Sequence, residues 1–190
     1  WYYRNEATPF VFRAVNRLDR DTSGLVLLAK NPYSSCVLSD AVKDHTIHRE
    51  YAAIVSGKTD ASGTIDLPIA RKDGSTIERV CDPERGETAV THYRTFAYNK
   101  DADISFIRLL LETGRTHQIR VHMKAIGHPL PGDFLYCPDY RFIDRQPLHS
   151  TYLRFSHPVT GEKLEFSASL PEDMRKLFPD IKNPSGPVFF

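Results

Sequence analysis

A chain of 190 residues is long enough for one well-packed domain and short for two. Apolar residues make up 41% of it and charged residues 26%, which excludes a disordered or fibrous class, and a net charge of +1 means that any nucleic-acid site must be a local basic patch. No apolar run is long enough for a membrane span, and three cysteines without a CxxC pair indicate neither a disulfide framework nor a zinc ribbon.

The first half of the chain predicts a strand, a helix and a second strand. The apolar residues 9–15 fit a short strand or a loop, and the continuous apolar run 25–30 predicts a buried strand. Asn31 and Pro32 are a good helix opening, with Asn as the cap, and the helix should continue to about Asp44. Residues 51–57 then predict a strand that ends in a glycine turn.

The second half predicts mainly hairpins. Residues 58–87 are rich in turn formers, and only 65–69 alternate as a short strand would. Residues 88–98 and 104–112 predict one antiparallel hairpin, and 148–156 and 163–169 predict another. Between them a helix is expected from Gly114 to Gly127, and a last short helix from 171 to 178. This pattern is typical of an α+β domain on a mostly antiparallel sheet.

Residues 15–24 concentrate charge beside an apolar run. Asp19 and Asp21 alternate there with Arg17 and Arg20, and the segment ends at Gly24. Loops that carry charge at the mouth of a sheet often hold binding or catalytic groups, and neighbouring guanidiniums favour an ionised carboxylate. A solvated turn with local ion pairs explains the composition equally well. Both interpretations stay open on this segment alone.

A second polar segment, residues 115–122, lies where the pattern changes from strand to helix. An arginine at such a corner, here Arg115, can clamp a phosphate or a carboxylate with two hydrogen bonds. The segment alone favours a simpler alternative, a helix with a basic outer face. His117 and His122 are five residues apart, so they do not form the one-face metal pair of an HExxH helix. Tyr51 could stack on a base, although a tyrosine at a strand start is more often a core residue.

Longer motifs occur in one order along the chain. Residues 16–24 read N-R-L-D-R-D-T-S-G, 49–57 read R-E-Y-A-A-I-V-S-G, 114–122 read G-R-T-H-Q-I-R-V-H, and 127–136 read G-H-P-L-P-G-D-F-L-Y. A late run, L-H-S-T-Y-L-R-F-S-H-P-V-T-G-E, spans 148–162. Together they resemble the motifs of the RluA family of RNA pseudouridine synthases. The family usually has histidine where this chain has Asn16.

The resemblance implies a pseudouridine synthase fold, an α+β domain with a mostly antiparallel mixed sheet flanked by helices and a catalytic cleft across the sheet. It implies isomerisation of uridine to pseudouridine within RNA, with no cofactor and no metal. By similarity Asp19 is the catalytic carboxylate, Arg115 pairs with it, and Tyr51 stacks on the uracil and helps to remove the proton on carbon 5. The expected RNA contacts are Arg17, which would enter the gap left by the flipped base, together with Arg20, His117 and Arg120.

Two functions remain open. The first is an enzyme that isomerises specific uridines in rRNA or tRNA, and the second is a catalytically inactive RNA-binding or RNA-folding homologue, which Asn16 suggests. The intact set of Asp19, Tyr51 and Arg115 favours the enzyme. We expect a cytoplasmic monomer with RNA as its partner and no membrane contact, in which residues 1–190 form a single catalytic domain. Because the chain starts at Trp1 and lacks the family's usual opening strand, we also expect a missing N-terminal segment.

Overall fold

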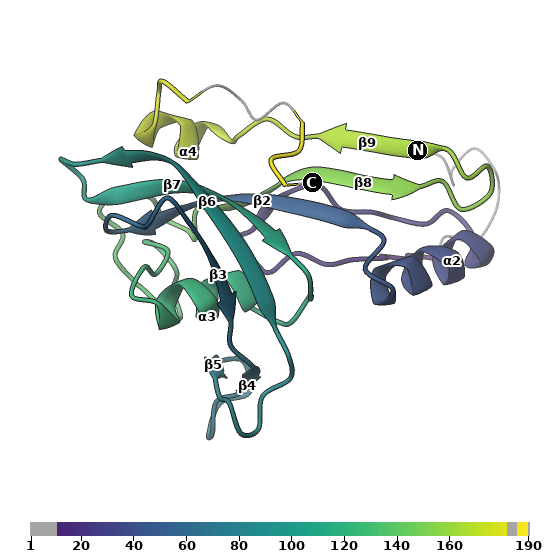
Figure 1. Cartoon of the computed structure of the whole chain (residues 1–190), viewed down its shortest axis with the longest axis horizontal. Helices are drawn as coiled ribbons and strands as arrows, with labels where there is room; N and C mark the ends of the chain where they lie inside the picture. Colours follow the sequence, from purple (N-terminus) through teal and green to yellow (C-terminus); the bar gives the residue numbers. More distant parts are fainter. Residues whose placement is uncertain (1–10, 182–185, 190) are drawn as a thin grey trace.

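The computed structural model describes residues 11–181 and 186–189. Its main sheet consists of β1 Ser23–Gly24, β2 His48–Ser56, β3 Ser62–Asp66, β6 Val90–Asn99, β7 Ile104–Leu111, β8 Leu148–Ser156 and β9 Lys163–Ser167. The strands lie in the order β1-β8-β2-β7-β6-β3, with β9 paired to β8 (Figure 1). Only β1 runs parallel to its neighbour, so within the described residues the sheet is mixed and mostly antiparallel.

The central strand β2 is buried on both faces, and its alternating side chains separate two cores. Tyr51, Ala53 and Val55 pack on one side with side chains of helix α3, which spans Gln118–Ala125. Ala52 and Ile54 pack on the other side with helix α4, which spans Glu172–Leu177. Figure 1 shows these helices on opposite sides of the sheet. A strand whose successive side chains face two layers needs apolar residues throughout. The predicted α+β class, a sheet flanked by helices, is confirmed.

Helix α2, Pro32–Lys43, begins as its sequence predicts. The Asn31 side chain accepts a hydrogen bond from the Ser34 N–H at 2.8 Å, and Pro32 occupies the first helical turn. Its Leu38 packs into a third core with Ile47 and side chains of β8. None of the helices in the described part of the chain is long and apolar enough to cross a membrane.

Both predicted hairpins are confirmed, as β6–β7 and β8–β9. The helix predicted after Gly114 is shorter than expected because residues 112–117 form a corner before α3. His117 occupies the N-cap position in the left-handed region, with a φ of 59°. Gly127, with a φ of 86°, follows the helix as predicted. Arg115 therefore lies in the corner loop, three residues before the helix.

The prediction of a buried strand over 25–30 is wrong. Only Ser23 and Gly24 pair with β8. The residues that follow form an irregular segment beside residues 13–15, where the Val15 N–H donates to the Leu27 carbonyl at 2.9 Å. Val26 and Leu28 are 43% and 49% exposed, so one face of the run meets solvent. Residues 11–15 form a loop with a single bridge to Leu28, and residues 9 and 10 lie outside the described range.

Residues 58–87, which had little readable pattern, form β3 and a separate two-stranded sheet. That sheet pairs β4, Ile69–Arg71, with β5, Arg79–Cys81, and projects from one end of the molecule (Figure 1). The alternating run 65–69 was expected to be one strand. It is instead divided between β3 and β4, because Pro68 interrupts it and its carbonyl accepts a bond from Asp82 of the other arm.

Candidate active site

Two side chains that precede β8 hold the loop that carries Asp19, residues 16–24, through hydrogen bonds. Gln146 donates to the carbonyl of Arg20 at 2.5 Å and to the hydroxyl of Thr22 at 3.2 Å. Arg145 donates to the next carbonyl of the loop at 3.1 Å. The loop also closes a turn on itself, because the Thr22 N–H donates to the Asp19 carbonyl at 3.1 Å. Asp19 is therefore fixed at the edge of the sheet by bonds to its own backbone neighbours.

The Asp19 carboxylate faces Arg120 of helix α3. Arg120 Nη1 donates to Asp19 Oδ2 at 3.2 Å, and the same guanidinium donates to Asp133 from Nε at 2.6 Å and from Nη2 at 2.8 Å. The side chains of Arg120 and Asp133 are 1% and 0% exposed, whereas that of Asp19 is 17% exposed. The two-bond contact with Asp133 fixes the plane of the guanidinium. Arg120 thus presents one N–H to the only carboxylate of this trio that solvent reaches.

Asp133 also shapes the loop that follows it. Its Oδ1 accepts from the N–H groups of Leu135 and Tyr136 at 3.0 and 3.2 Å. The Tyr136 hydroxyl accepts from the Arg79 N–H of β5 at 2.8 Å and lies 2.9 Å from His117 Nδ1. The hydroxyl thus links β5 to the ring of His117. Burial, and then the charge of Arg120, lowers the pKa of His117.

Tyr51 lies in the core beneath the loop and also lines the pocket around Asp19. It is 6% exposed and belongs to the cluster that contains Ile119 and Leu148. Burial raises the pKa of Tyr51, with a smaller contribution from Asp19, although Arg49 and a hydrogen bond with Ser150 oppose the shift. The hydroxyl is therefore protonated at neutral pH. Tyr51 is therefore a core residue that also borders the pocket, and its contact with a base stays a prediction.

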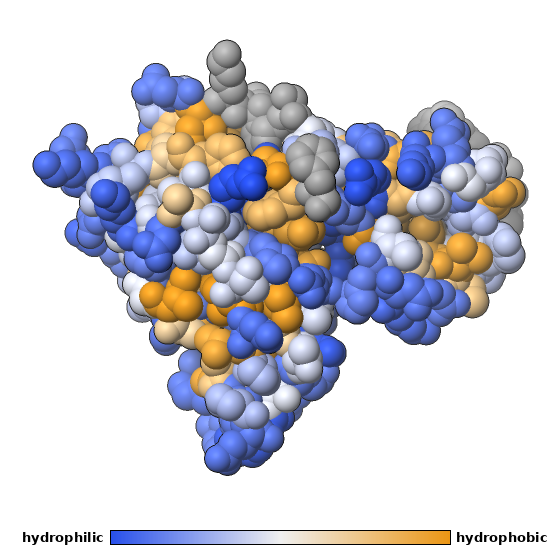
Figure 2. Space-filling model, in the orientation of Figure 1, coloured by the Kyte–Doolittle hydropathy of each residue, from blue (hydrophilic) through white to orange (hydrophobic). Residues whose placement is uncertain are grey.

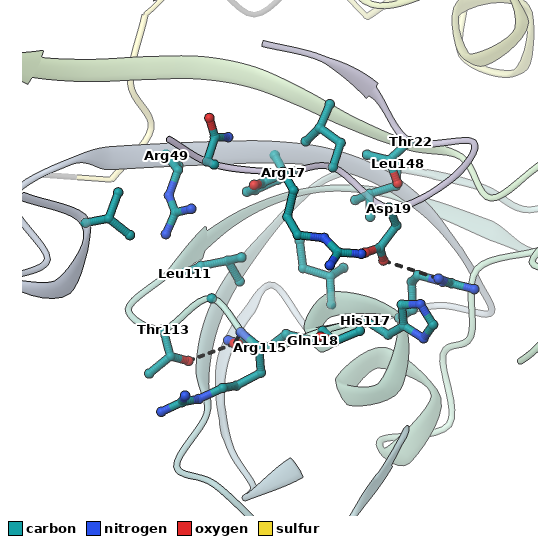
Figure 3. Close-up of a pocket in the computed structure, with 18 of the residues that line it drawn as sticks. Arg17, Asp19, Thr22, Arg49, Leu111, Thr113, Arg115, His117, Gln118 and Leu148 are labelled. Atoms are coloured by element: carbon teal, nitrogen blue, oxygen red, sulfur yellow. Dashed lines mark hydrogen bonds and ion pairs between the residues drawn. The ribbon is translucent and has the colours of Figure 1, made fainter. Parts of the chain in front are cut away.

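A pocket of about 510 Å³ surrounds these groups. Figure 3 shows Arg49 at one end of it and Asp19 with His117 at the other. Of the described residues that line it, Asp19 is the only carboxylate, and five are cations: Arg17, Lys43, Arg49, Arg115 and Arg120. The Arg49 Nε is buried and has no hydrogen-bond partner among the described residues. A pocket with this charge balance and an unpaired guanidinium suits an anionic ligand.

The geometry agrees with what the comparisons with known proteins show. A family model described as RNA pseudouridylate synthase matches residues 2–125. The chain belongs to this family. The resemblance to RluA-type pseudouridine synthases is thereby confirmed.

Relatives from the pseudouridine synthase family match most of the chain. An uncharacterised RNA pseudouridine synthase, YjbO of Bacillus subtilis, is 47% identical over 177 residues, which are 93% of this chain and 62% of that protein. Ribosomal large subunit pseudouridine synthase D of Vibrio cholerae is 44% identical over 174 residues, covering 84% of this chain and 53% of that protein. The chain thus spans little more than half the length of these curated relatives. The solved structure of human RNA Pseudouridylate Synthase Domain Containing 1 has a TM-score of 0.74 at 24% identity, covering 92% of this chain and 83% of that one, which confirms the fold.

The expected pairing of Arg115 with Asp19 is wrong. Arg115 instead forms an ion pair with Glu87 and donates from Nε to the Thr88 carbonyl at 3.0 Å. The corner before α3 turns its side chain away from Asp19, and Arg120 occupies the place expected for it. The role expected for Arg120, a contact with RNA, does not fit a side chain that is 1% exposed and bound on both sides by carboxylates.

Of the other three predicted RNA contacts, Arg17 and His117 line the pocket and Arg20 does not. Arg17 is exposed and lines the pocket, and no hydrogen bond or ion pair holds its side chain among the described residues. Arg20 pairs with Asp21 and stacks over Phe134 at 4.0 Å, outside the pocket lining. His117 lines the pocket, but Tyr136 engages one of its ring nitrogens. Arg17 is thus the predicted contact whose side chain is freest to meet a ligand.

The sequence interpretation missed Arg49, Lys43 and Asp133. Asp133 was visible within the run at 127–136, and Arg49 within the run at 49–57, but neither was given a role. Both runs could have supplied the signal, since a charged residue inside a long motif usually has a fixed partner or ligand. Lys43 lies at the end of α2, where no local pattern distinguishes it from a solvated lysine.

Asn16, the departure from the family motif, has a structural contact. Its Oδ1 accepts from the Leu27 N–H at 2.8 Å, next to the bond between the Val15 N–H and the Leu27 carbonyl at 2.9 Å. The amide therefore closes the base of the Asp19 loop.

In the described residues no group of three or more histidine, cysteine or acidic side chains is arranged to hold a metal ion.

Proposed function

We propose that this protein is an RNA pseudouridine synthase that isomerises specific uridines of ribosomal or transfer RNA in the cytoplasm. In this reaction the bond between N1 of uracil and C1′ of ribose breaks, and a bond between carbon 5 and C1′ forms. Carbon 5 loses a proton and N1 gains one, so the reaction needs no external donor or acceptor. The observation that carries the proposal is Asp19, paired with Arg120, as the only carboxylate in a cationic pocket of the described structure.

Asp19 is the proposed reactive group. It attacks C1′ of the flipped nucleoside or assists cleavage of the glycosidic bond, and either role requires an ionised carboxylate. Arg120 donates a direct charge-assisted bond of 3.2 Å to one of its oxygens. Because Asp133 holds the guanidinium with two bonds, Arg120 fixes one oxygen of Asp19 and leaves the other for the nucleoside. This assignment replaces Arg115 by Arg120 as the partner of the reactive carboxylate.

Tyr51 and Arg17 are proposed to hold the uridine in place. A uridine in a helix must leave its stack before a side chain reaches its glycosidic bond, at a cost of a few kcal/mol. Arg17, which is exposed on the pocket rim, can fill the gap that the base leaves. The Tyr51 ring offers an apolar surface beside Asp19 for the detached uracil. Its raised pKa favours this packing role over removal of the carbon 5 proton.

The phosphate of the flipped nucleotide is proposed to meet Arg49. This guanidinium lines the pocket with a buried Nε that has no partner in the described structure. A buried N–H without an acceptor is costly, and a phosphate oxygen would satisfy it with the geometry that a guanidinium prefers. The alternative of an inactive RNA-binding homologue has no supporting observation, since Asn16 has a structural contact and Asp19 contacts Arg120.

The test is a map of pseudouridines in total RNA from cells with and without the gene. We expect at least one site to disappear with the gene and to return when the wild-type protein is supplied. Asp19→Asn should fail to restore it. The matched variant Asp21→Asn should restore it, because it removes the same charge from an exposed side chain two residues away. A map unchanged by loss of the gene, or a site restored by Asp19→Asn, would contradict the proposal.

A further inference from the structure

A second pocket, of about 360 Å³, adjoins the active-site pocket. The two share Gly114, Arg115 and Thr116, the corner before α3. Its other wall is the β4–β5 hairpin, the hydrophilic projection at the lower end of the molecule in Figure 2. Four arginines line this hairpin pocket against a single carboxylate, Glu87: they are Arg71, Arg79, Arg85 and Arg115. The lining is therefore strongly cationic.

Two of these arginines oppose each other without a carboxylate between them. Arg71 and Arg79 are direct cross-strand partners in β4–β5. Arg79 donates from Nη1 only to the carbonyls of Ile77 and Glu78, at 3.2 and 3.0 Å, and Arg71 has no ion pair in the described structure. Like charges directly opposite each other destabilise a two-stranded ribbon. An anion bound between them would remove that cost.

The other cations of the same hairpin are already paired, which makes the Arg71–Arg79 pair unusual. Lys72 binds Glu78 at 2.9 Å, and Arg85 binds both Asp73 at 3.0 Å and Asp82 at 2.8 Å. The hairpin thus has carboxylates within reach of its cations, but none is placed between the two opposed guanidiniums. This arrangement leaves a cationic gap of local origin in a chain whose net charge is only +1.

The hairpin is joined to the active site by hydrogen bonds rather than by a loose tether. The Arg79 N–H donates to the Tyr136 hydroxyl at 2.8 Å, and that hydroxyl contacts His117 in the active-site pocket at 2.9 Å. Ile69 of β4 packs in a core cluster with Tyr136 and Val121 of α3. The position of Arg79 is therefore fixed relative to the helix that carries Arg120.

We propose that the hairpin pocket binds a backbone phosphate of the RNA strand next to the target uridine. The inference rests on the proposed function, and it adds the path of the strand, which leaves the active site over Gly114 and Thr116. One guanidinium can donate two parallel hydrogen bonds to a phosphate, and two facing arginines can hold one phosphodiester from both sides. Each phosphate contact contributes affinity that carries no sequence information and weakens with salt. The pocket would therefore position the strand without selecting its sequence.

Binding of a fluorescent decauridylate at several salt concentrations tests the site without requiring turnover. The double variant Arg71→Gln/Arg79→Gln should bind about tenfold or more weakly than the wild type at low salt. The slope of log K against log salt should fall by about 1.4, from two lost contacts on a single strand. Lys72→Gln, which removes one charge from the same hairpin but outside the pocket lining, should leave affinity and slope nearly unchanged.

The thermal unfolding midpoint separates a binding role from a structural one. Removing two opposed like charges should leave the midpoint of the double variant equal to or above that of the wild type. A lower midpoint together with weaker binding would mean that the arginines support the hairpin fold, and would overturn the proposal. Equal losses of affinity in the double variant and in Lys72→Gln would also overturn it, because they would indicate general electrostatics.

Turnover on a transcript that contains a mapped target uridine distinguishes failure of this proposal from failure of the proposed function. The double variant should raise KM about tenfold or more with kcat within about twofold. Pseudouridine formation with wild-type KM in the double variant would overturn the phosphate site alone. If the wild type forms no pseudouridine, the proposed function fails, and the salt dependence of decauridylate binding still decides whether the pocket binds phosphate.

Discussion

Replacing Arg120 by methionine should reduce both stability and turnover, for reasons that can be separated. Arg120 donates two bonds to Asp133 and one to Asp19. Its removal leaves the Asp133 carboxylate, which is 0% exposed, without a cation. Breaking a buried pair in this way costs about 3–5 kcal/mol of unfolding free energy. The lost charge-assisted bond to Asp19 is a separate effect of about 1.5–3 kcal/mol, which lowers kcat/KM roughly 10- to 150-fold.

A second substitution distinguishes the two effects. In Arg120→Met/Asp133→Asn the buried charge is gone, and the remaining amide oxygen still accepts from the Leu135 and Tyr136 N–H groups. Urea unfolding should show that the double variant recovers most of the lost stability, whereas turnover stays as low as in the single variant. Turnover is measured with RNA tritiated at carbon 5 of uridine, since the reaction releases that proton to water.

The result that would refute this reasoning is a well-folded Arg120→Met/Asp133→Asn protein with wild-type turnover. Arg115→Met provides the matched comparison, because it removes the guanidinium that was first expected to pair with Asp19. Its ion pair with Glu87 is on the surface, so its loss should change stability by less than about 1 kcal/mol. The variant should weaken RNA binding with a much smaller effect on kcat than Arg120→Met.

Two further predictions concern stability. Burial lowers the pKa of three histidines below the ordinary value of 6.5, so the unfolded chain takes up protons that the folded chain does not as pH falls through that value. The three are His117, His122 and His149. The free energy of unfolding, measured with urea, should therefore fall below pH 6.5 by up to about 1.4 kcal/mol per pH unit for each histidine. Substitution of any one of them should make this fall smaller. Gly24→Ala should cost about 1–3 kcal/mol from its φ of 110°, and more because its Cβ would lie 2.2 Å from the Ser150 carbonyl oxygen. Gly161→Ala has a similar φ of 72° and open space, so an equal loss there would contradict the role assigned to the clash.

The parts of the fold that the sequence predicted are those with a local cause. The cap formed by Asn31 and Pro32 and the glycine after α3 act within a few residues of their own positions. The run at 25–30 was misassigned because an apolar run shows neither how long its pairing lasts nor which face meets solvent. Its strand stops after Gly24, where the backbone approaches Ser150, a residue 126 positions further along the chain.

Most of the residues that the sequence singled out line the pocket around Asp19, but their pairing was not predicted. Asp19 and Tyr51 could be found because each lies in a motif with few alternatives. Choosing between Arg115 and Arg120 required the position at which the helix begins, which is set by the left-handed His117. Periodicity also failed here, because α3 is buried on every side from Gln118 to Met123, so the helix has no basic outer face in its first turns. The deciding partner, Asp133, lies in a loop after the helix.

Asn16 shows why a departure from a motif does not decide activity. The family's histidine position lies three residues before Asp19, and in this chain its side chain bonds the backbone of Leu27. A neutral imidazole nitrogen can accept the same kind of bond from an N–H group. In this chain the Asn16 amide closes the base of the loop, and Arg145 and Gln146 support the loop from elsewhere. Asn16 therefore braces the Asp19 loop, whereas the Asp19 carboxylate is held by Arg120 of helix α3.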